Sequence, residues 1–199
     1  MSDVEIHQIP ALRSPVMVIA FSGWNDAGEA ATGAASHLLA SWTDSSTDVV
    51  PELIADVDPE DFYDFQVNRP TVYVDDSSIR SLTWPGTQVF GLRTPEIDHD
   101  FVVVRGVEPS MKWKTFAADV LDLADDLEVD MVITLGSMLA DTPHTRPITV
   151  SGSGAHPEIA RRLGVEISKY EGPTGILGVI QDACVRRGID AISLWAAIP

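Results

Sequence analysis

The stretch of residues 129–147 constrains the fold most, because an unbroken apolar run leads directly into a loop rich in polar side chains. Residues 130–135 read Asp-Met-Val-Ile-Thr-Leu, and Gly136 follows them. A continuous apolar run of strand length that ends at a glycine is typical of a strand buried on both faces of a parallel or mixed sheet. Because such sheets have helices on both sides, the run predicts an α/β fold.

The same pattern recurs elsewhere in the chain, with helical periodicity between the apolar runs. Residues 16–21 and 101–104 are also continuous apolar runs. Asp26, with Glu29 three positions later, predicts an acidic capping box at the start of a helix. Residues 71–95 instead alternate between apolar and polar side chains, which indicates an antiparallel excursion. The sequence therefore predicts a three-layer α/β sandwich with a mixed, mostly parallel sheet.

The 199 residues suffice for one domain with a substantial core, so we expect a single α/β domain over residues 1–199. The chain stops at a predicted strand, and we expect the natural protein to continue beyond it. Cys184 is the only cysteine, which rules out an intrachain disulfide, and its place on the apolar face of a predicted helix favours a core position.

The charge balance argues against two classes of partner. Thirteen basic and thirty acidic residues give a formal net charge of −17, which repels nucleic acid and anionic membrane surfaces. No apolar run approaches the roughly 20 residues that a membrane helix needs, and the first residues are acidic rather than basic. We therefore expect a cytoplasmic protein that binds neither nucleic acid nor membrane.

Polar side chains follow two of the predicted strands at their carboxyl ends, where ligands bind in open α/β sheets. If the two strands are neighbours, these side chains share one cleft. The candidate residues are Asn25 and Asp26 after the first strand, and Ser137, Asp141, His144 and Arg146 after the second.

None of these residues completes a known catalytic set. A serine hydrolase would pair Ser137 with His144 and with Asp141 or Glu171, but Leu139 replaces the second glycine of a nucleophile elbow. The five histidines are spread singly, without ligand spacing, so no metal is expected. The glycine-rich residues 151–154 lack the lysine of a phosphate-binding loop, and a flexible turn is the favoured interpretation.

Several short motifs together resemble the proteasome assembly chaperone 2 family, in its actinobacterial branch. The resemblance covers nearly the whole chain and depends on the order and spacing of the motifs. The motifs are Gly23-Trp24-Asn25-Asp26-Ala27-Gly28, Glu108-Pro109-Ser110 with Trp113, Leu135-Gly136-Ser137, Thr142-Pro143-His144-Thr145-Arg146-Pro147, Tyr170-Glu171-Gly172-Pro173-Thr174-Gly175-Ile176 and Ser193-Leu194-Trp195-Ala196.

This resemblance implies a fold similar to purine nucleoside phosphorylases and related hydrolases. It also implies homo-oligomers, a trimer among them, and, in eukaryotic relatives, non-catalytic help in assembling the proteasome α-ring. Such chaperones often dock through a tail of a hydrophobic residue, a tyrosine and one further residue, whereas residues 196–199 read Ala-Ala-Ile-Pro. The motifs add Trp24 and Glu171 to the candidate pocket.

Two hypotheses of function follow. The first is a non-enzymatic, oligomeric chaperone or scaffold without cofactors, which binds itself and proteasome subunits. The second is a small-molecule binding protein, or an enzyme of hydrolase or phosphorylase type, that uses the cleft at the strand ends. The family resemblance and the lack of a complete catalytic set favour the first.

Overall fold

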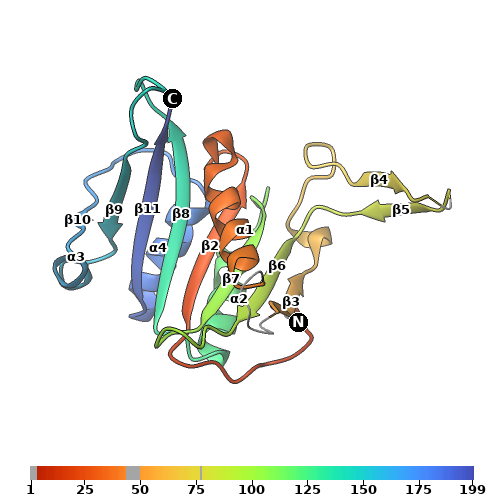
Figure 1. Ribbon diagram of the computed structural model, residues 1–199, viewed down its shortest axis with the longest axis horizontal. Helices are drawn as coiled ribbons and strands as arrows, with labels where there is room; N and C mark the ends of the chain where they lie inside the picture. The colour runs from red at the N-terminus through yellow and green to blue at the C-terminus, as the bar shows by residue number, and fades with distance from the viewer. Residues whose placement is uncertain (1–3, 44–49, 77) are drawn as a thin grey trace.

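A nine-stranded sheet forms the centre of the protein, whose computed structural model describes residues 4–43, 50–76 and 78–199 (Figure 1). The strands lie in the order β1-β3-β6-β7-β2-β8-β11-β9-β10. Their bounds are Val4–Ile6 (β1), Val16–Ser22 (β2), Glu52–Val57 (β3), Thr87–Leu92 (β6), Phe101–Val107 (β7), Met131–Leu139 (β8), Val150–Gly154 (β9), Glu166–Ile167 (β10) and Asp190–Ile198 (β11).

The strands predicted from apolar runs form the parallel centre of this sheet. Strands β7, β2, β8 and β11 pair in parallel, and β10 pairs in parallel with β9. The pairs β1–β3, β3–β6, β6–β7 and β9–β11 are antiparallel. The mixed sheet of an α/β protein is thus confirmed. Within the described nine-stranded sheet, four pairs are parallel and four are antiparallel, and three of the parallel pairs lie in its middle.

Helices cover both faces of the sheet and give the expected three layers. Helix α1 (Ala30–Thr43) lies on one face, while α2 (Trp113–Asp126) and α4 (Ile176–Arg187) pack together on the other (Figure 1). Helix α3 (Pro157–Leu163) lies beside β9, β10 and β11. Within the described ranges, no helix combines the length and the apolar character that a membrane span requires.

The larger core lies between the sheet and the pair α2 and α4. Alternate side chains of β2 point into it, among them Phe21, which is fully buried. The ring of Phe116 from α2 meets the rings of Phe21 and Phe62 edge to face, with centroids 5.6 and 5.3 Å apart. Edge-to-face aromatic pairs add stabilisation beyond their buried area, so these three rings anchor α2 on the sheet.

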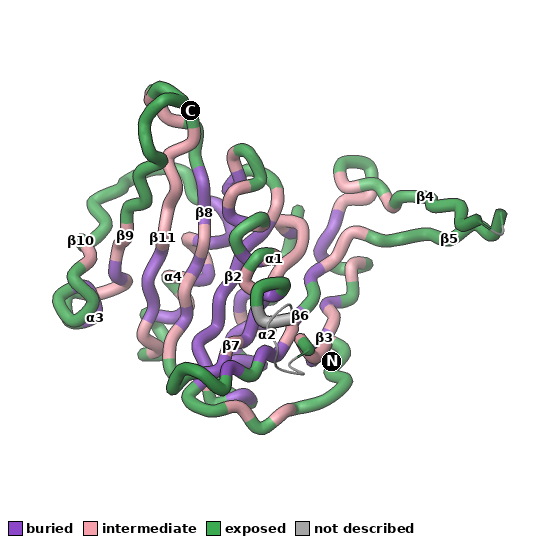
Figure 2. Tube along the Cα trace, in the orientation of Figure 1, coloured by how far each residue is buried: buried purple, intermediate pink, exposed green. Residues whose placement is uncertain are grey.

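The core on the other face is smaller, because α1 presents small side chains to the sheet. Ala31 and Ala35 of α1 are buried against Ala20 of β2 and Val103 of β7. Side chains of this size allow the helix axis to approach the strands closely. The buried tube in Figure 2 is accordingly concentrated in the central strands, whereas the outer strands carry more exposed residues.

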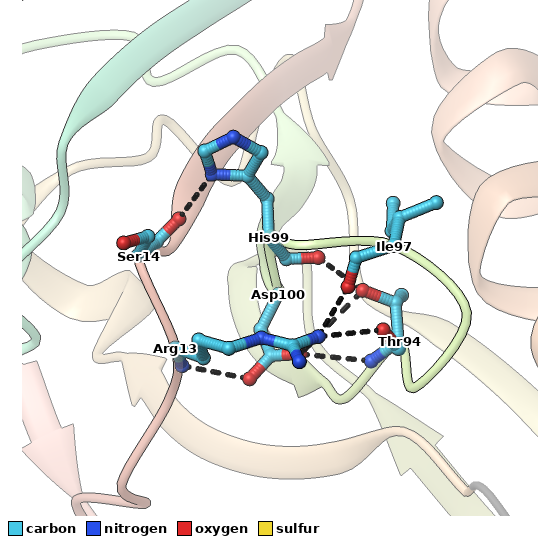
Figure 3. A network of polar contacts seen from close by, with 6 residues as sticks. All are labelled: Arg13, Ser14, Thr94, Ile97, His99 and Asp100. Atoms are coloured by element: carbon cyan, nitrogen blue, oxygen red, sulfur yellow. Dashed lines mark hydrogen bonds and ion pairs between the residues drawn. The ribbon is translucent and has the colours of Figure 1, made fainter.

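A network of polar contacts lies at the amino ends of the parallel strands β2 and β7 (Figure 3). The carboxylate of Asp100, which is 6% exposed, accepts hydrogen bonds from the backbone N–H groups of Arg13 and Thr94 at 2.7 and 2.9 Å. The Arg13 guanidinium donates to the carbonyl oxygen of Thr94 at 3.0 Å, and His99 Nδ1 lies 2.9 Å from the carbonyl oxygen of Ser14. The network ties the segment before β2 to the loop before β7.

Two strands stand apart from the sheet as an arm. Strands β4 (Thr71–Val74) and β5 (Arg80–Thr83) pair with each other in antiparallel fashion and form a separate two-stranded sheet. In Figures 1 and 2 this arm extends away from the body, and all eight of its strand residues are exposed. The antiparallel excursion predicted over residues 71–95 therefore consists of this arm and of β6.

Two predictions about strand ends were wrong. The loop expected from residue 136 onward begins later, because β8 continues to Leu139 and holds Ser137 within the strand. Residues 151–154, expected as a flexible turn, belong to strand β9. In both cases the extension pairs with β11, a partner distant in sequence, so the local composition could not reveal it.

Candidate functional site

A tight turn connects β2 to α1 at the carboxyl ends of the parallel strands. Gly23 and Gly28 have positive φ values of +124° and +63°, a conformation that glycine adopts without strain. Residues 27–29, which include Gly28, form a single 3-10 turn (Ala27–Glu29) before α1 begins. The turn brings Asn25 and Asp26 next to strand β8.

Asp26 holds the start of α1, although not through the predicted capping box. Its Oδ1 accepts hydrogen bonds from the N–H groups of Ala31 at 2.8 Å and Thr32 at 3.3 Å, and its Oδ2 accepts one from the Thr32 hydroxyl. The capping box was wrong because the 3-10 turn shifts the helix start to Ala30, and Glu29 makes no bond back to Asp26 through its side chain in the described structure. The carboxylate is 7% exposed and acts as a cap for a helix that begins later than predicted.

Ser137 lies against this turn from the neighbouring strand. Its backbone N–H donates to the carbonyl oxygen of Asn25 at 2.8 Å, and its hydroxyl donates to the carbonyl oxygen of Ala27 at 2.9 Å. Asp26 Oδ1 lies 3.4 Å from the same hydroxyl. The side chain is 1% exposed. Ser137 thus connects β8 to the turn, and its hydroxyl proton is donated to a backbone carbonyl oxygen.

Asn25 points to the other side, toward a carboxylate that the site prediction did not include. Its Nδ2 donates to Oε1 of Glu108 at 2.7 Å, and the same oxygen accepts the N–H of Ile176 at 2.9 Å. Glu108 directly follows β7, and Ile176 is the first residue of α4. A Cβ on Gly175 would lie 2.5 Å from the Asn25 amide atoms, so glycine is required there.

These contacts join five elements at the end of the sheet where the parallel strands finish. Asn25, Asp26, Ser137 and Glu108 connect the ends of β2, β7 and β8 with the starts of α1 and α4. Each of the four side chains bonds to protein atoms, which is the arrangement of a rigid structural junction. We call these four residues the strand-end junction.

The other candidate residues lie outside the junction. Asp141, His144, Arg146 and Glu171 are all exposed, and no hydrogen bond or ion pair of their side chains is found in the described structure. Trp24 is 69% exposed at the turn itself. The structure therefore brings together Asn25, Asp26 and Ser137 and leaves the remaining five candidates at the surface.

Sequence reasoning missed Glu108 as a site residue. It is a single acid before a proline, with no periodic pattern around it, and the sole signal was its place in one of the family motifs. Its function depends on Asn25 and Ile176, which are 83 and 68 positions away. Only the folded chain brings these groups within hydrogen-bonding distance.

The second feature that the sequence did not reveal is that the apolar side chains of the arm are exposed. Val72 and Leu82 are direct cross-strand partners and lie on the same face, with Val74 two residues along. Tyr73, on the opposite face, is 56% exposed. A two-stranded hairpin is marginally stable alone in water, and here the body of the protein does not cover it. The arm is a candidate contact surface for another protein.

The base of the arm is fixed to the body by aromatic packing. The rings of Phe65 and Trp84 meet edge to face with centroids 4.9 Å apart. Tyr63 is buried beneath, and its hydroxyl lies 2.8 Å from Thr87 Oγ1 and donates to the carbonyl oxygen of Val107 at 2.9 Å. Burial raises the pKa of Tyr63 to about 12, partly offset by the Thr87 hydrogen bond. The arm thus starts from a firm base while its strands are exposed.

Comparison with known proteins gives a consistent family assignment. The sequence model of the PAC2 family matches residues 20–199. A crystal structure of a PAC2 family protein from Streptomyces avermitilis is 50% identical, covers 93% of this chain and 76% of its own, and superposes with a TM-score of 0.85. No curated protein matches the chain significantly.

Two further structures share the fold. The Mycobacterium tuberculosis proteasome-assembly chaperone homologue Rv2125 is 48% identical, with a TM-score of 0.82 over 92% of this chain and 75% of its own. The archaeal proteasome activator PbaB from Pyrococcus furiosus has a TM-score of 0.73 at 16% identity, over 98% of this chain and 79% of its own. At that identity the likeness to PbaB concerns the fold alone.

Proposed function

The chain belongs to the PAC2 family, and on this premise we propose that it is a non-enzymatic, proteasome-assembly-chaperone-like protein that acts through protein–protein contacts. A relative that is 48% identical is described as a proteasome-assembly chaperone homologue, which supports this class of function. The proposed protein is a single-domain, cytoplasmic homo-oligomer, and proteasome subunits are its proposed partners.

The observation that carries this proposal is the exposed apolar arm. Val72, Val74, Ile79 and Leu82 are each at least 43% exposed, on a ribbon that extends from the body. Apolar side chains gathered on a projecting element mark contact surfaces, since water solvates them poorly and a partner protein would cover them. We propose that the arm packs on a second copy of this chain.

The hydrogen bonds of the strand-end junction also support a non-enzymatic function. A hydrolase would need a nucleophile with a base within hydrogen-bonding distance. Ser137 donates to a backbone carbonyl, and His144 is an exposed loop residue with no bond to it in the described structure. The polar groups that cluster at the strand ends are arranged to hold strands and helices together.

Native mass spectrometry of the purified protein tests the oligomer. We expect a homo-oligomer, with a trimer as the proposed form, and expect Val72→Thr/Leu82→Thr to shift the distribution to the monomer. Threonine is β-branched and favours strands at both positions, so the arm retains its conformation while its apolar contact is weakened. A monomeric wild-type protein would contradict the proposal.

The matched control is Val185→Thr on α4. Val185 is 45% exposed, similar to Val72 at 43%, but it lies on the body rather than on the arm. This variant should keep the oligomer of the wild type. If it dissociates as readily as the arm variant, the contact surface lies elsewhere and the arm is not the oligomerisation element.

The partner is tested by reconstitution with purified proteasome α-type and β-type subunits. We expect the protein to form a complex with α-type subunits or to speed the formation of their ring. Native mass spectrometry at successive times measures both the complex and the ring. Arm variants report whether the same surface contacts the subunits. Unchanged assembly kinetics together with no complex would rule out the chaperone function.

A further inference from the structure

Beside the junction, on the face covered by α1, the protein has a hollow of about 250 Å³. It lies where β2 and β7 end and β6 begins, which is the edge of an α/β sheet where ligands bind. None of the predicted site residues lines it. Its polar lining comes from Ser22, Thr32, Ser36, Gln88 and Arg105.

Arg105 is exceptional among the cations of this chain. Eleven of the other lysine and arginine residues are exposed, whereas Arg105 is half-buried. The side chain of Arg187 is also only 29% exposed, but it is paired with Asp122 and Asp125. Within the described residues, it has no carboxylate at ion-pair distance, although the chain carries thirty acidic residues. A partly desolvated cation is favourable when an anion accompanies it, and the described residues supply none at ion-pair distance here.

The contacts that Arg105 does make hold it in place and leave most of its donors unused. Its Nη1 donates to Ser36 Oγ at 3.2 Å, and its guanidinium carbon lies 5.2 Å from the centroid of the Phe90 ring. A guanidinium has five N–H donors in a fixed planar fork, and a single one is engaged in the described structure. Such a fork matches the oxygens of a phosphate or carboxylate group.

The neighbouring hydroxyls extend this set of donors. Ser36 accepts the hydrogen bond from Arg105, and its own hydroxyl proton, which has no acceptor among the described residues, can donate into the hollow. Ser22 also lines the hollow, and its hydroxyl has no hydrogen bond in the described structure. Thr32 donates to Asp26, so it contributes no donor to a ligand.

From this arrangement we propose that the hollow binds a small oxyanion, with Arg105 as its cationic ligand and the hydroxyls of Ser22 and Ser36 as supporting donors. The volume is below the roughly 300–1,000 Å³ of pockets for drug-sized ligands, so it suits a phosphate or carboxylate group on a small molecule. This site is separate from the proposed protein contacts on the arm.

Isothermal titration calorimetry with inorganic phosphate tests the proposal, at constant ionic strength adjusted with chloride. The constant ionic strength matters, because any salt screens a chain of net charge −17. We expect saturable phosphate binding by the wild type and a loss of about tenfold or more in Arg105→Met, as charge-assisted hydrogen bonds predict. Malonate as a second probe distinguishes a carboxylate ligand from a phosphate ligand.

Arg80→Met is the matched control, since it removes the same charge from an exposed arginine on the arm. It should bind phosphate as the wild type does, and Arg105→Met should keep the oligomer of the wild type. Should Arg105→Met fail to fold, Ser36→Ala decides, because it removes one supporting donor and should weaken binding several-fold. Heat signals of wild type that match chloride alone, or equal affinities in Arg105→Met, Ser36→Ala and wild type, would overturn the site.

Discussion

The side-chain amide of Asn25 donates a 2.7 Å hydrogen bond to Oε1 of Glu108, across 83 residues of sequence. The same carboxylate oxygen accepts the N–H of Ile176 at the start of α4. This one carboxylate oxygen thus connects the carboxyl ends of β2 and β7 to α4, which lies on the opposite face of the sheet from α1. This arrangement gives the strand-end junction a measurable role in stability.

Glu108→Ala should destabilise the protein by about 2–3 kcal/mol, since it leaves the Asn25 amide and the Ile176 N–H without their acceptor in a poorly hydrated site. Urea unfolding followed by circular dichroism measures the change. Glu96→Ala, at an exposed loop position, should stay within about 0.5 kcal/mol of wild type. Equal effects of the two substitutions would show that the junction does not contribute to stability.

Replacing each of two glycines by alanine should change the stability of the protein in opposite directions. Gly175→Ala should destabilise the protein, because the new Cβ would lie 2.5 Å from Asn25 atoms and 2.8 Å from Glu108 Oε1. Gly33→Ala within α1 should stabilise it by about 0.4–1 kcal/mol, because no atom lies within 4 Å of the new Cβ and alanine favours the helix. Thermal unfolding of both variants compares them directly, and a gain from Gly175→Ala would refute the packing shown here.

The network of Figure 3 should be as important for stability as the junction. Asp100→Ala removes the acceptor of the Arg13 and Thr94 N–H groups and should cost about 2–3 kcal/mol in unfolding free energy. Asp98→Ala in the same loop, at an exposed position, is the control and should be nearly neutral. Hydrogen exchange at residues 13–16 should also become faster in Asp100→Ala, and unchanged exchange there would argue against the network as a clamp.

Cys184 provides a test of burial through its chemistry. Burial raises the pKa of this thiol to about 12, with the charge of Arg187 opposing the shift. Because the thiolate is the reactive form, labelling of the native protein by iodoacetamide at pH 8–9 should be slower than in denaturant by about tenfold or more. Rapid native labelling would mean that α4 opens readily or that the thiol is accessible.

The same pKa determines the sign of an alkaline effect on stability. The unfolded thiol ionises near pH 9, whereas the folded one stays neutral up to about pH 12. The neutral thiol therefore contributes stability that is complete below pH 9 and is lost as the pH rises toward 12. Relative to Cys184→Ala, the wild type should lose unfolding free energy over this pH window, and parallel pH curves would contradict the shift.

The parts of the fold that the sequence predicted correctly are those determined locally. The apolar runs at 16–21, 101–104 and 130–135 are long enough to bury both faces, and they became neighbouring parallel strands. Helical periodicity was also expected between these runs, and α2 lies between β7 and β8. In these segments the side chains specify the environment of each residue directly.

The parts that were missed depend on contacts between distant segments. Gly152 and Gly154 look like turn residues, but they lie in β9 because they pair with Leu194 and Ile192 of β11. Close packing requires glycine there, since added Cβ atoms would lie 2.8 Å from Val165 and 2.9 Å from Ala160. Ser137 continues β8 since it faces Ala196 across a parallel ladder. The lengths of β8 and β9 thus depend on pairing with β11, which cannot be predicted from their local sequences.

The position of β11 inside the sheet has a consequence for synthesis on the ribosome. Among the described strands, β9 and β10 reach the sheet only through β11, which is made after both of them. These two strands therefore have nowhere to dock until residues 190–198 have left the exit tunnel, and β8 keeps an open edge until then. Between the synthesis of β8 and that of β11 the nascent chain therefore exposes an unpaired strand edge, and pairing with β11 removes that site of aggregation.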